Sequence, residues 1–333
     1  MSQAIPHAVW LEDVGRKDLS CVGGKNASMG EMLTSLSAKG IKVPPGFATT
    51  AEAYWRFIEQ NKLREPIESC LADLAAGRSE LAQVGDTIRQ AFLRANLPKE
   101  TTEAISTAYR ELCRRTDRSN TTVAVRSSAT AEDLPDASFA GQQETYLNIR
   151  GERALLDACR RCYASLFTDR AISYRQSKGF DHLKVALSVG VQSMVRSDIG
   201  SAGVMFSIDT ETGCNRVVLI NAAWGLGENV VQGTIDPDEY QVFKPLLSDP
   251  SLSPIIEKTL GEKALKMIYA SDDDNPTENV PTSKAERTTF VLSDHEILNL
   301  ARWACAIEDH YGQPMDMEWA KDGESGELFI VQA

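Results

Sequence analysis

The sequence predicts a mixed α+β fold with a helical N-terminal part and mixed or antiparallel sheets. Short β-branched or apolar runs at 123–125, 145–149 and 185–195 are typical of strands. Residues 50–115 instead carry apolar side chains at helical spacing, which predicts a block of helices. Two runs near the C-terminal end, at 314–320 and 328–333, are separated by a glycine-containing turn and predict a hairpin.

The composition excludes several classes of partner. Hydrophobic residues make up 42% and charged residues 25% of the 333 positions, which is ordinary for a globular protein. The net charge of −12 makes nucleic acid and anionic membranes poor partners. The seven cysteines are scattered, no apolar run approaches the ~20 residues of a membrane span, and the first residues lack a secretory pattern. We therefore expect a cytoplasmic protein that binds neither nucleic acid nor membrane.

The stretch at 122–145 is the first candidate for ligand binding. Arg126 is expected at the exit of the strand 123–125, before small and hydroxylated residues that lead through Gly141 to Thr145. A guanidinium can bind phosphate oxygens in a bidentate way, and loop N–H groups can close over them. A polar hairpin whose arginine pairs with a local carboxylate explains the same residues equally well.

A second candidate is Lys25, in the run V-G-G-K-N-A-S at 22–28. The two glycines predict a turn and the following residues a helix, so Lys25 is expected near a helix N-terminus. The helix dipole disfavours a lysine there and favours an anion, which the lysine and the free N–H groups would share. Taken alone, a solvent-exposed lysine beside a turn is the simpler interpretation.

The end of the run at 185–195 is a candidate for contact with a base, and a later loop is a candidate for contact with a ligand. Gln192 is an amide among apolar residues that include Met194 and Val195, a composition that suits an adenine and equally a plain core strand. The loop at 223–233 contains three glycines, which allow a backbone to approach a ligand closely. Glu228 in this loop is expected either to contact that ligand or to cap a helix.

The C-terminal hairpin is the candidate metal site. Asp316 and Glu318 alternate with apolar residues, so they project from one strand face, and the hairpin brings Gln332 near them. Carboxylate and amide oxygens suit Mg²⁺ that bridges polyphosphate oxygens. Two solvated acids on an exposed strand face are the alternative.

The rest of the chain completes the predicted organisation. Three lobes are expected, at 1–120 with the helical insertion 50–115, at 121–200 and at 201–333. Thr49 and Glu52 predict a capping box, and Ser293 caps another predicted helix. Further helices are expected at 151–167 and 169–177, strands at 202–206, 217–220 and 240–243, and a solvated acidic loop at 270–287.

Five motifs in this order carry a family resemblance. They are V-G-G-K-N-A-S at 22–28, V-A-V-R-S-S-A-T-A-E-D at 123–133, A-S-F-A-G-Q-Q at 137–143, W-G-L-G-E at 224–228 and M-D-M-E-W at 315–319. The chain resembles the N-terminal ATP-binding domain of the phosphoenolpyruvate synthase (pyruvate, water dikinase) family. Pyruvate phosphate dikinase and the rifampin phosphotransferases are relatives, and the runs at 209–213, 229–233 and 236–239 favour the synthase branch.

The resemblance implies an ATP-grasp fold that binds ATP and Mg²⁺ between lobes. It implies that Lys25 and Arg126 bind the phosphates and that residues 141–145 cover them. Residues 192–195 would hold the adenine, with Glu228 near the nucleotide. The implied Mg²⁺ ligands are Glu318, Gln332 and Asp316, and the implied catalytic residues are Lys25, Arg126 and Glu318.

The resemblance also implies partners within a longer chain. In this family ATP phosphorylates a histidine on a swivelling domain, and the phosphohistidine then converts pyruvate to phosphoenolpyruvate on a third domain, with release of AMP and phosphate. A G-G-x-T-C-H segment is absent here, and the sequence ends before the family's phosphate-binding arginine, so an excised first domain is expected. The alternatives are a dikinase domain with another acceptor, a non-catalytic nucleotide-binding module and, last, a carboxylate–amine ligase.

Overall fold

The computed structural model describes residues 5–130, 133–134, 137–138, 144–270 and 276–333. It divides into two compact units, Met1–Glu31 with Pro45–Met194 and Met32–Pro44 with Val195–Ala333. The three lobes expected from the sequence differ from this division, because the first two lie mostly in one unit. No described helix combines the length and apolar character that crossing a membrane requires. Both units contain helices and antiparallel sheets, so the predicted α+β class is confirmed.

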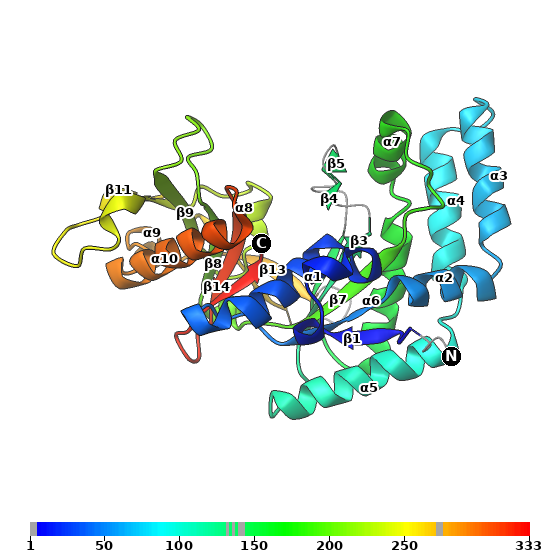
Figure 1. The fold of residues 1–333 in the computed structure, drawn as a ribbon, viewed down its shortest axis with the longest axis horizontal. Helices are drawn as coiled ribbons and strands as arrows, with labels where there is room; N and C mark the ends of the chain where they lie inside the picture. The colour runs from blue at the N-terminus through cyan, green and yellow to red at the C-terminus, as the bar shows by residue number, and fades with distance from the viewer. Residues whose placement is uncertain (1–4, 131–132, 135–136, 139–143, 271–275) are drawn as a thin grey trace. The chain divides into compact units, whose positions relative to one another are not determined.

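The first unit contains the predicted helical block. Its helices are α2 (Ala51–Gln60), α3 (Arg64–Ala75), α4 (Leu81–Arg94), α5 (Lys99–Arg115), α6 (Glu152–Ser165) and α7 (Asp169–Lys178). Figure 1 shows α2, α3 and α4 as neighbours in the blue to cyan part of the chain. Aromatic rings fill the core between α2 and α6, with the Phe57 and Tyr163 centroids 5.4 Å apart. The predicted cap at Thr49 is wrong by one position, because Thr50 Oγ1 accepts the Ala53 N–H at the start of α2.

A five-stranded sheet lies beside these helices in the order β1-β2-β7-β3-β6. The strands are β1 (Ala8–Trp10), β2 (Gly46–Thr49), β7 (Leu187–Ser193), β3 (Val123–Ala129) and β6 (Thr145–Ile149), and all pairs are antiparallel. Two short strands, β4 (Asp133–Leu134) and β5 (Ala137–Ser138), pair separately. The expectation that Arg126 ends its strand is wrong, since β3 continues to Ala129, paired with β7.

Helix α1 (Leu19–Ser35) is interrupted at Gly23, whose φ of 72° lies in the left-handed region. Such a conformation suits glycine and strains other residues. A Cβ on Gly23 would also lie 2.6 Å from the backbone oxygen of Ser128 on β3. The predicted turn at the two glycines is therefore confirmed as a break in the helix, and Lys25 follows it in the first turn of the second segment.

The second unit is built on a six-stranded antiparallel sheet in the order β11-β10-β9-β8-β14-β15. The strands are β8 (Ser201–Phe206), β9 (Val217–Trp224), β10 (Asp238–Phe243), β11 (Ile255–Thr259), β14 (Asp316–Lys321) and β15 (Leu328–Gln332). Helix α10 (Asp294–Tyr311) lies against β9, β10 and β11. Its predicted capping box at Ser293 is confirmed, and Gly312 ends it in the left-handed conformation.

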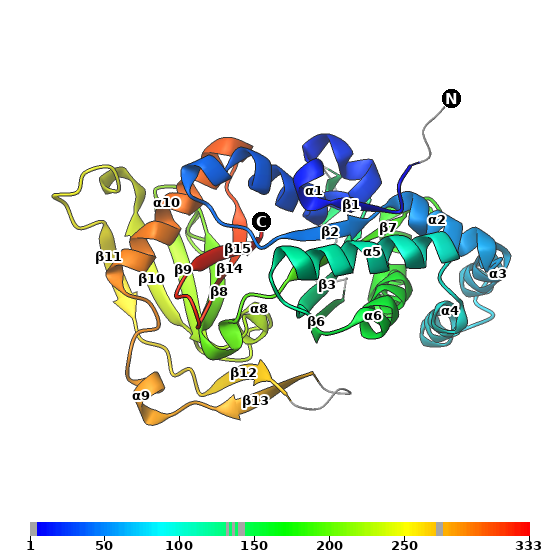
Figure 2. The same cartoon turned by 90° about the horizontal axis from the view of Figure 1, so that it is seen from below.

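A separate hairpin corrects the predicted acidic loop. Strands β12 (Leu265–Tyr269) and β13 (Thr277–Pro281) pair with each other and are followed by α9 (Lys284–Arg287), so most of the described part of 270–287 is strand or helix (Figure 2). The aspartate run at 272–274 lies outside the described residues. The one-turn helix α8 (Glu228–Val231) follows β9 in the glycine-rich segment.

Candidate functional site

The two faces of the first unit's sheet differ in chemistry. On one face, side chains of β3 and β7 such as Val125 and Val189 belong to the helical core. On the other face, Arg126 lies opposite Gly190 and Ser128 lies opposite Ser188. Because side chains alternate along a strand, this second face carries small and polar residues from both strands. It is the face on which the sequence-predicted phosphate ligands lie.

Arg126 has neighbours from two strands on this face. Its Nη1 donates to Gln192 Oε1 at 2.8 Å, and it lies opposite Thr145 on β6. The structure therefore brings together three residues that the sequence assigned to a nucleotide. Gln192 is buried, with 6% of its surface exposed. Because its side chain has little freedom to move, the hydrogen bond from Arg126 also restrains the guanidinium.

The second segment of α1 lies over the same face. Asn26 Nδ2 donates to Ser188 Oγ at 2.9 Å and to Val22 O at 3.0 Å. A Cβ on Gly190 would lie only 2.2 Å from Asn26 Oδ1, so glycine is needed there for the helix to approach β7. Lys25 precedes Asn26 and is therefore held on the helix turn that contacts these two strands.

Asn26 was missed by the sequence reasoning, although it lies inside the V-G-G-K-N-A-S motif. Its signal was an amide directly after the lysine at a helix start. Burial of a polar side chain normally requires hydrogen bonds, and Asn26 has them from α1 and β7 while only 5% exposed. We interpret it as the residue that fixes the α1 turn on the sheet.

The end of β7 leads from one unit to the other. Met194 N donates to Thr122 O at 2.9 Å in the first unit. Val195 begins the second unit and packs with Ala202 of β8 and Ala320 of β14. The contact of these two residues with adenine stays a prediction.

The carboxylates of β14 lie on one face of the second unit's sheet. Met317 and Trp319 are buried, and Lys321 pairs with Glu296 of α10, so odd-numbered positions face this helix. Asp316 and Glu318 therefore lie on the opposite face, and Glu318 is directly opposite Gln332 of β15. The arrangement expected from the alternating pattern is present.

The electrostatics of this face fit a bound cation. Burial and, next, the negative charge of Glu318 raise the pKa of the Asp316 carboxyl. A divalent cation would relieve that repulsion, and two carboxylates with an amide are the hard oxygen donors that Mg²⁺ prefers. Among the described residues no group of three or more His, Cys, Asp or Glu is arranged to hold a metal. The amide of Gln332, opposite Glu318, would add an oxygen donor to the two carboxylates.

Glu228 lies near the same part of the second unit. It opens α8, accepts a hydrogen bond from Gln232 Nε2 at 2.7 Å and follows Gly227. A Cβ on Gly227 would lie 3.3 Å from the Cβ of Ala202, which itself contacts Val195. Val195 and the Glu228 loop thus meet at one strand of the sheet. Gly141, the predicted centre of the phosphate-covering loop, lies outside the described residues.

Comparison with known proteins identifies the family of the chain. Residues 19–333 match the family model described as "Pyruvate phosphate dikinase, AMP/ATP-binding domain". The chain belongs to this family.

Curated relatives carry one name. The chain is 54% identical over 98% of its length to a phosphoenolpyruvate synthase of Synechocystis sp. and covers 41% of that protein. It is 54% identical over 97% of its length to the Helicobacter pylori protein of the same name and 50% identical over 98% to that of Escherichia coli, again covering 41% of each. The chain thus spans about two fifths of the length of these relatives.

Proposed function

We propose that this chain is the ATP-binding part of a phosphoenolpyruvate synthase and that it binds Mg-ATP. The observation that carries the proposal is the polar sheet face where Arg126, Gln192 and the α1 turn with Lys25 meet. Membership of a family of AMP/ATP-binding domains supports the nucleotide. The names of the long relatives support the synthase over a drug-modifying or other dikinase.

The roles follow from charge. ATP carries about four negative charges, and a chain of net charge −12 can bind it only where local cations offset them. Lys25 and Arg126 provide positive charge at the phosphates, with Thr145 and residues around Gly141 closing over them. Glu318, Asp316 and Gln332 hold Mg²⁺, which neutralises phosphate charge. Met194, Val195, Gln192 and Glu228 contact the adenine end.

In the full-length protein these residues serve phosphoryl transfer. Such transfer depends on positioning and on stabilising charge rather than on covalent chemistry by the protein. We propose that the acceptor is a histidine on another domain of the same chain, and that this phosphohistidine supports conversion of pyruvate to phosphoenolpyruvate with AMP and phosphate as co-products. The guanidinium of Arg126, already fixed by Gln192, would act without reorganisation as charge develops.

Calorimetric titration of Mg-ATP into this chain tests the proposal. We expect saturable binding that EDTA abolishes or weakens, and at least a tenfold loss of affinity for Arg126→Ala and for Glu318→Gln. Arg56→Ala is the matched control, since the Arg56 side chain is 59% exposed and pairs with Glu52 and Glu59 on α2. Absence of binding by the unmodified chain, or equal losses in all three variants, would contradict the proposal.

A further inference from the structure

The loop that presents Glu228 is attached to the β12–β13 hairpin at successive positions. Leu226 N donates to Met267 O at 2.9 Å, and Gly225 forms a parallel bridge with the same residue. Gly225 has a φ of +85°, and a Cβ there would lie 2.4 Å from Met267 O. The hairpin backbone therefore follows the loop so closely that only glycine fits between them.

Two side chains extend this attachment to both ends of the loop. Before it, Trp224 Nε1 donates to the Glu286 backbone oxygen in α9 at 3.0 Å. After it, Asn229 Nδ2 donates to Asn279 Oδ1 of β13 at 2.7 Å. Asn229 is 2% exposed, and its carbonyl and Oδ1 accept from Thr234 Oγ1. The loop is thus held by the hairpin from Trp224 through Asn229.

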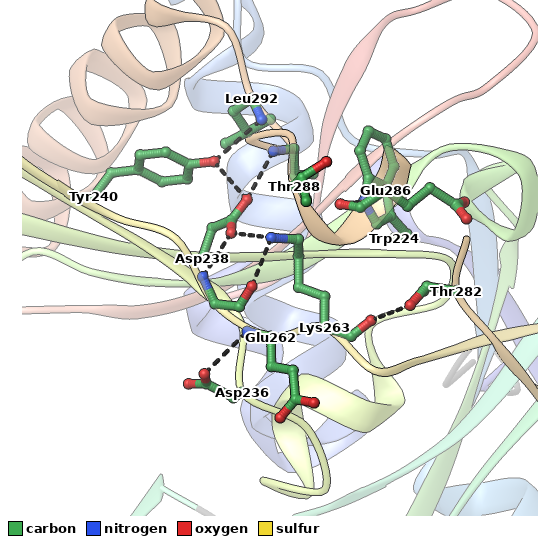
Figure 3. Close-up of polar contacts among 12 residues, drawn as sticks. Trp224, Asp236, Asp238, Tyr240, Glu262, Lys263, Thr282, Glu286, Thr288 and Leu292 are labelled. Carbon is green, nitrogen blue, oxygen red and sulfur yellow. Dashed lines mark hydrogen bonds and ion pairs between the residues drawn. The ribbon is translucent and has the colours of Figure 1, made fainter. Parts of the chain in front are cut away.

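The root of the hairpin is itself fixed inside the second unit (Figure 3). The ammonium of Lys263 is fully buried against the Asp238 carboxylate of β10 and also donates to Gly261 O at 3.0 Å. On the other strand, Thr282 Oγ1 donates to Lys263 O, and Thr282 N donates to Ala264 O at 3.1 Å. The two ends of the hairpin are therefore joined where the chain leaves the main sheet.

Helix α8 needs such external support. It spans four residues, and a single helical turn is not stable by itself in water because nucleation is unfavourable. Glu228 is its first residue and Asn229 its second, so the position of the Glu228 backbone depends on what holds Asn229. Of the contacts described above between this loop and the β12–β13 hairpin, the Asn229–Asn279 pair is the one that joins two side chains, so it can be removed without a change of backbone.

We propose that Asn279 is a positioning residue for nucleotide binding, which it serves by fixing Asn229 and thereby the carboxylate of Glu228. This inference rests on the proposed function, because it assumes that Glu228 contacts the nucleotide. Asn279 itself is exposed on the hairpin, so its side chain is not needed for a core. The β12–β13 hairpin would then influence the affinity of the chain for Mg-ATP through Asn229 and Glu228, without contacting the nucleotide itself.

The test compares Asn279→Leu with Asn279→Asp, which keeps the oxygen that accepts from Asn229. Loss of one hydrogen bond predicts a dissociation constant for Mg-ATP about five- to tenfold higher in Asn279→Leu, with recovery in Asn279→Asp. Glu278→Leu, on the neighbouring exposed position, is the matched control and is expected to bind as the unmodified chain does. Melting temperatures of Asn279→Asp and Glu278→Leu are expected to match that of the unmodified chain, and that of Asn279→Leu to be slightly lower, because the buried Asn229 amide loses an acceptor.

Two further measurements separate positioning from general damage. In a Glu228→Gln background, Asn279→Leu should weaken Mg-ATP binding little further, because the carboxylate that Asn279 positions is already altered. In the ligand-free chain, amides at 225–231 should exchange faster in Asn279→Leu, while those of β10 stay unchanged. Additive losses or unchanged exchange at 225–231 would overturn the positioning role. If the unmodified chain bound no Mg-ATP while exchange still responded, the proposed function would fail and the link to a ligand with it.

Discussion

The buried pair of Lys263 and Asp238 yields a sharp stability prediction. Both side chains are 0% exposed. The Asp238 carboxylate also accepts from Gly261 N at 2.9 Å, Val291 N at 2.8 Å and the Tyr240 hydroxyl at 3.2 Å. Lys263→Met would leave these three donors but remove the opposite charge. Loss of one partner of a buried ion pair costs about 3–5 kcal/mol, a large part of the 5–15 kcal/mol by which domains are typically stable.

A double variant without either charge tests whether the unpaired Asp238 carboxylate causes the loss of stability in Lys263→Met. Asp238→Asn combined with Lys263→Met keeps an oxygen that can accept from the surrounding N–H groups and leaves no net charge buried. We expect it to be less destabilised than Lys263→Met alone, which is a strong non-additivity. Lys258→Met is the control on the adjacent strand, because Lys258 pairs with an aspartate that is 68% exposed; such pairs contribute about 0–1 kcal/mol.

Urea unfolding gives the free energies, and amide exchange assigns them to the correct unit. Two compact units need not unfold in one transition, so protection in peptides from β10 and α10 should be followed separately. Protection there should fall in Lys263→Met while peptides from α4 and α6 keep theirs. If Lys263→Met costs no more than Lys258→Met, the reasoning about an uncompensated buried charge is refuted.

Three other predictions concern the first unit. Arg126→Ala should lower the turnover of the full-length enzyme by roughly 10²–10³, as for removal of one preorganised donor; an activity within a few-fold of the unmodified enzyme in a coupled phosphate-release assay would contradict this. Gly23→Ala should destabilise the chain in thermal melts by about 1–3 kcal/mol more than Gly40→Ala. Both glycines have a positive φ, but a Cβ at Gly40 meets nothing within 4 Å, whereas a Cβ at Gly23 meets the β3 backbone. Burial and then the charge of Arg175 lower the pKa of His182 from 6.5 to about 4, so the unfolded chain binds more protons and stability should fall as pH drops through that window. His182→Asn should flatten this pH dependence, and an unchanged slope in urea titrations at pH 4–7 would argue against it.

Local patterns predicted the hairpin site better than the sheet site. Asp316, Glu318 and Gln332 lie on strands joined by one short turn, so alternation alone places them on a common face. The contact of Arg126 with Gln192 joins β3 to β7 across 66 positions of sequence. Strand order of this kind depends on tertiary packing, and the residue pattern does not encode it.

The errors have physical causes as well. Residues 127–129 are two serines and an alanine, which indicate a loop, but β7 pairs with all three and extends β3. Residues 277–281 are mostly polar and contain a proline, so they lack the alternation of a half-buried strand. Strand β13 nevertheless forms, because β12 pairs with it along its whole length. In both cases neighbouring strands override a weak local preference.

Strand β14 carries both proposed metal ligands and buried core residues within six positions. It pairs with β8 on one side and with β15 on the other. Its buried Met317 and Trp319 alternate with Asp316 and Glu318. An exchange of one carboxylate for another donor changes neither the ladder nor the apolar layer under α10. Under the proposed function, the donors at Asp316 and Glu318 can therefore be exchanged in evolution or by design at little risk to the scaffold, whereas a change at the buried Met317, Trp319 or Ala320 first affects folding.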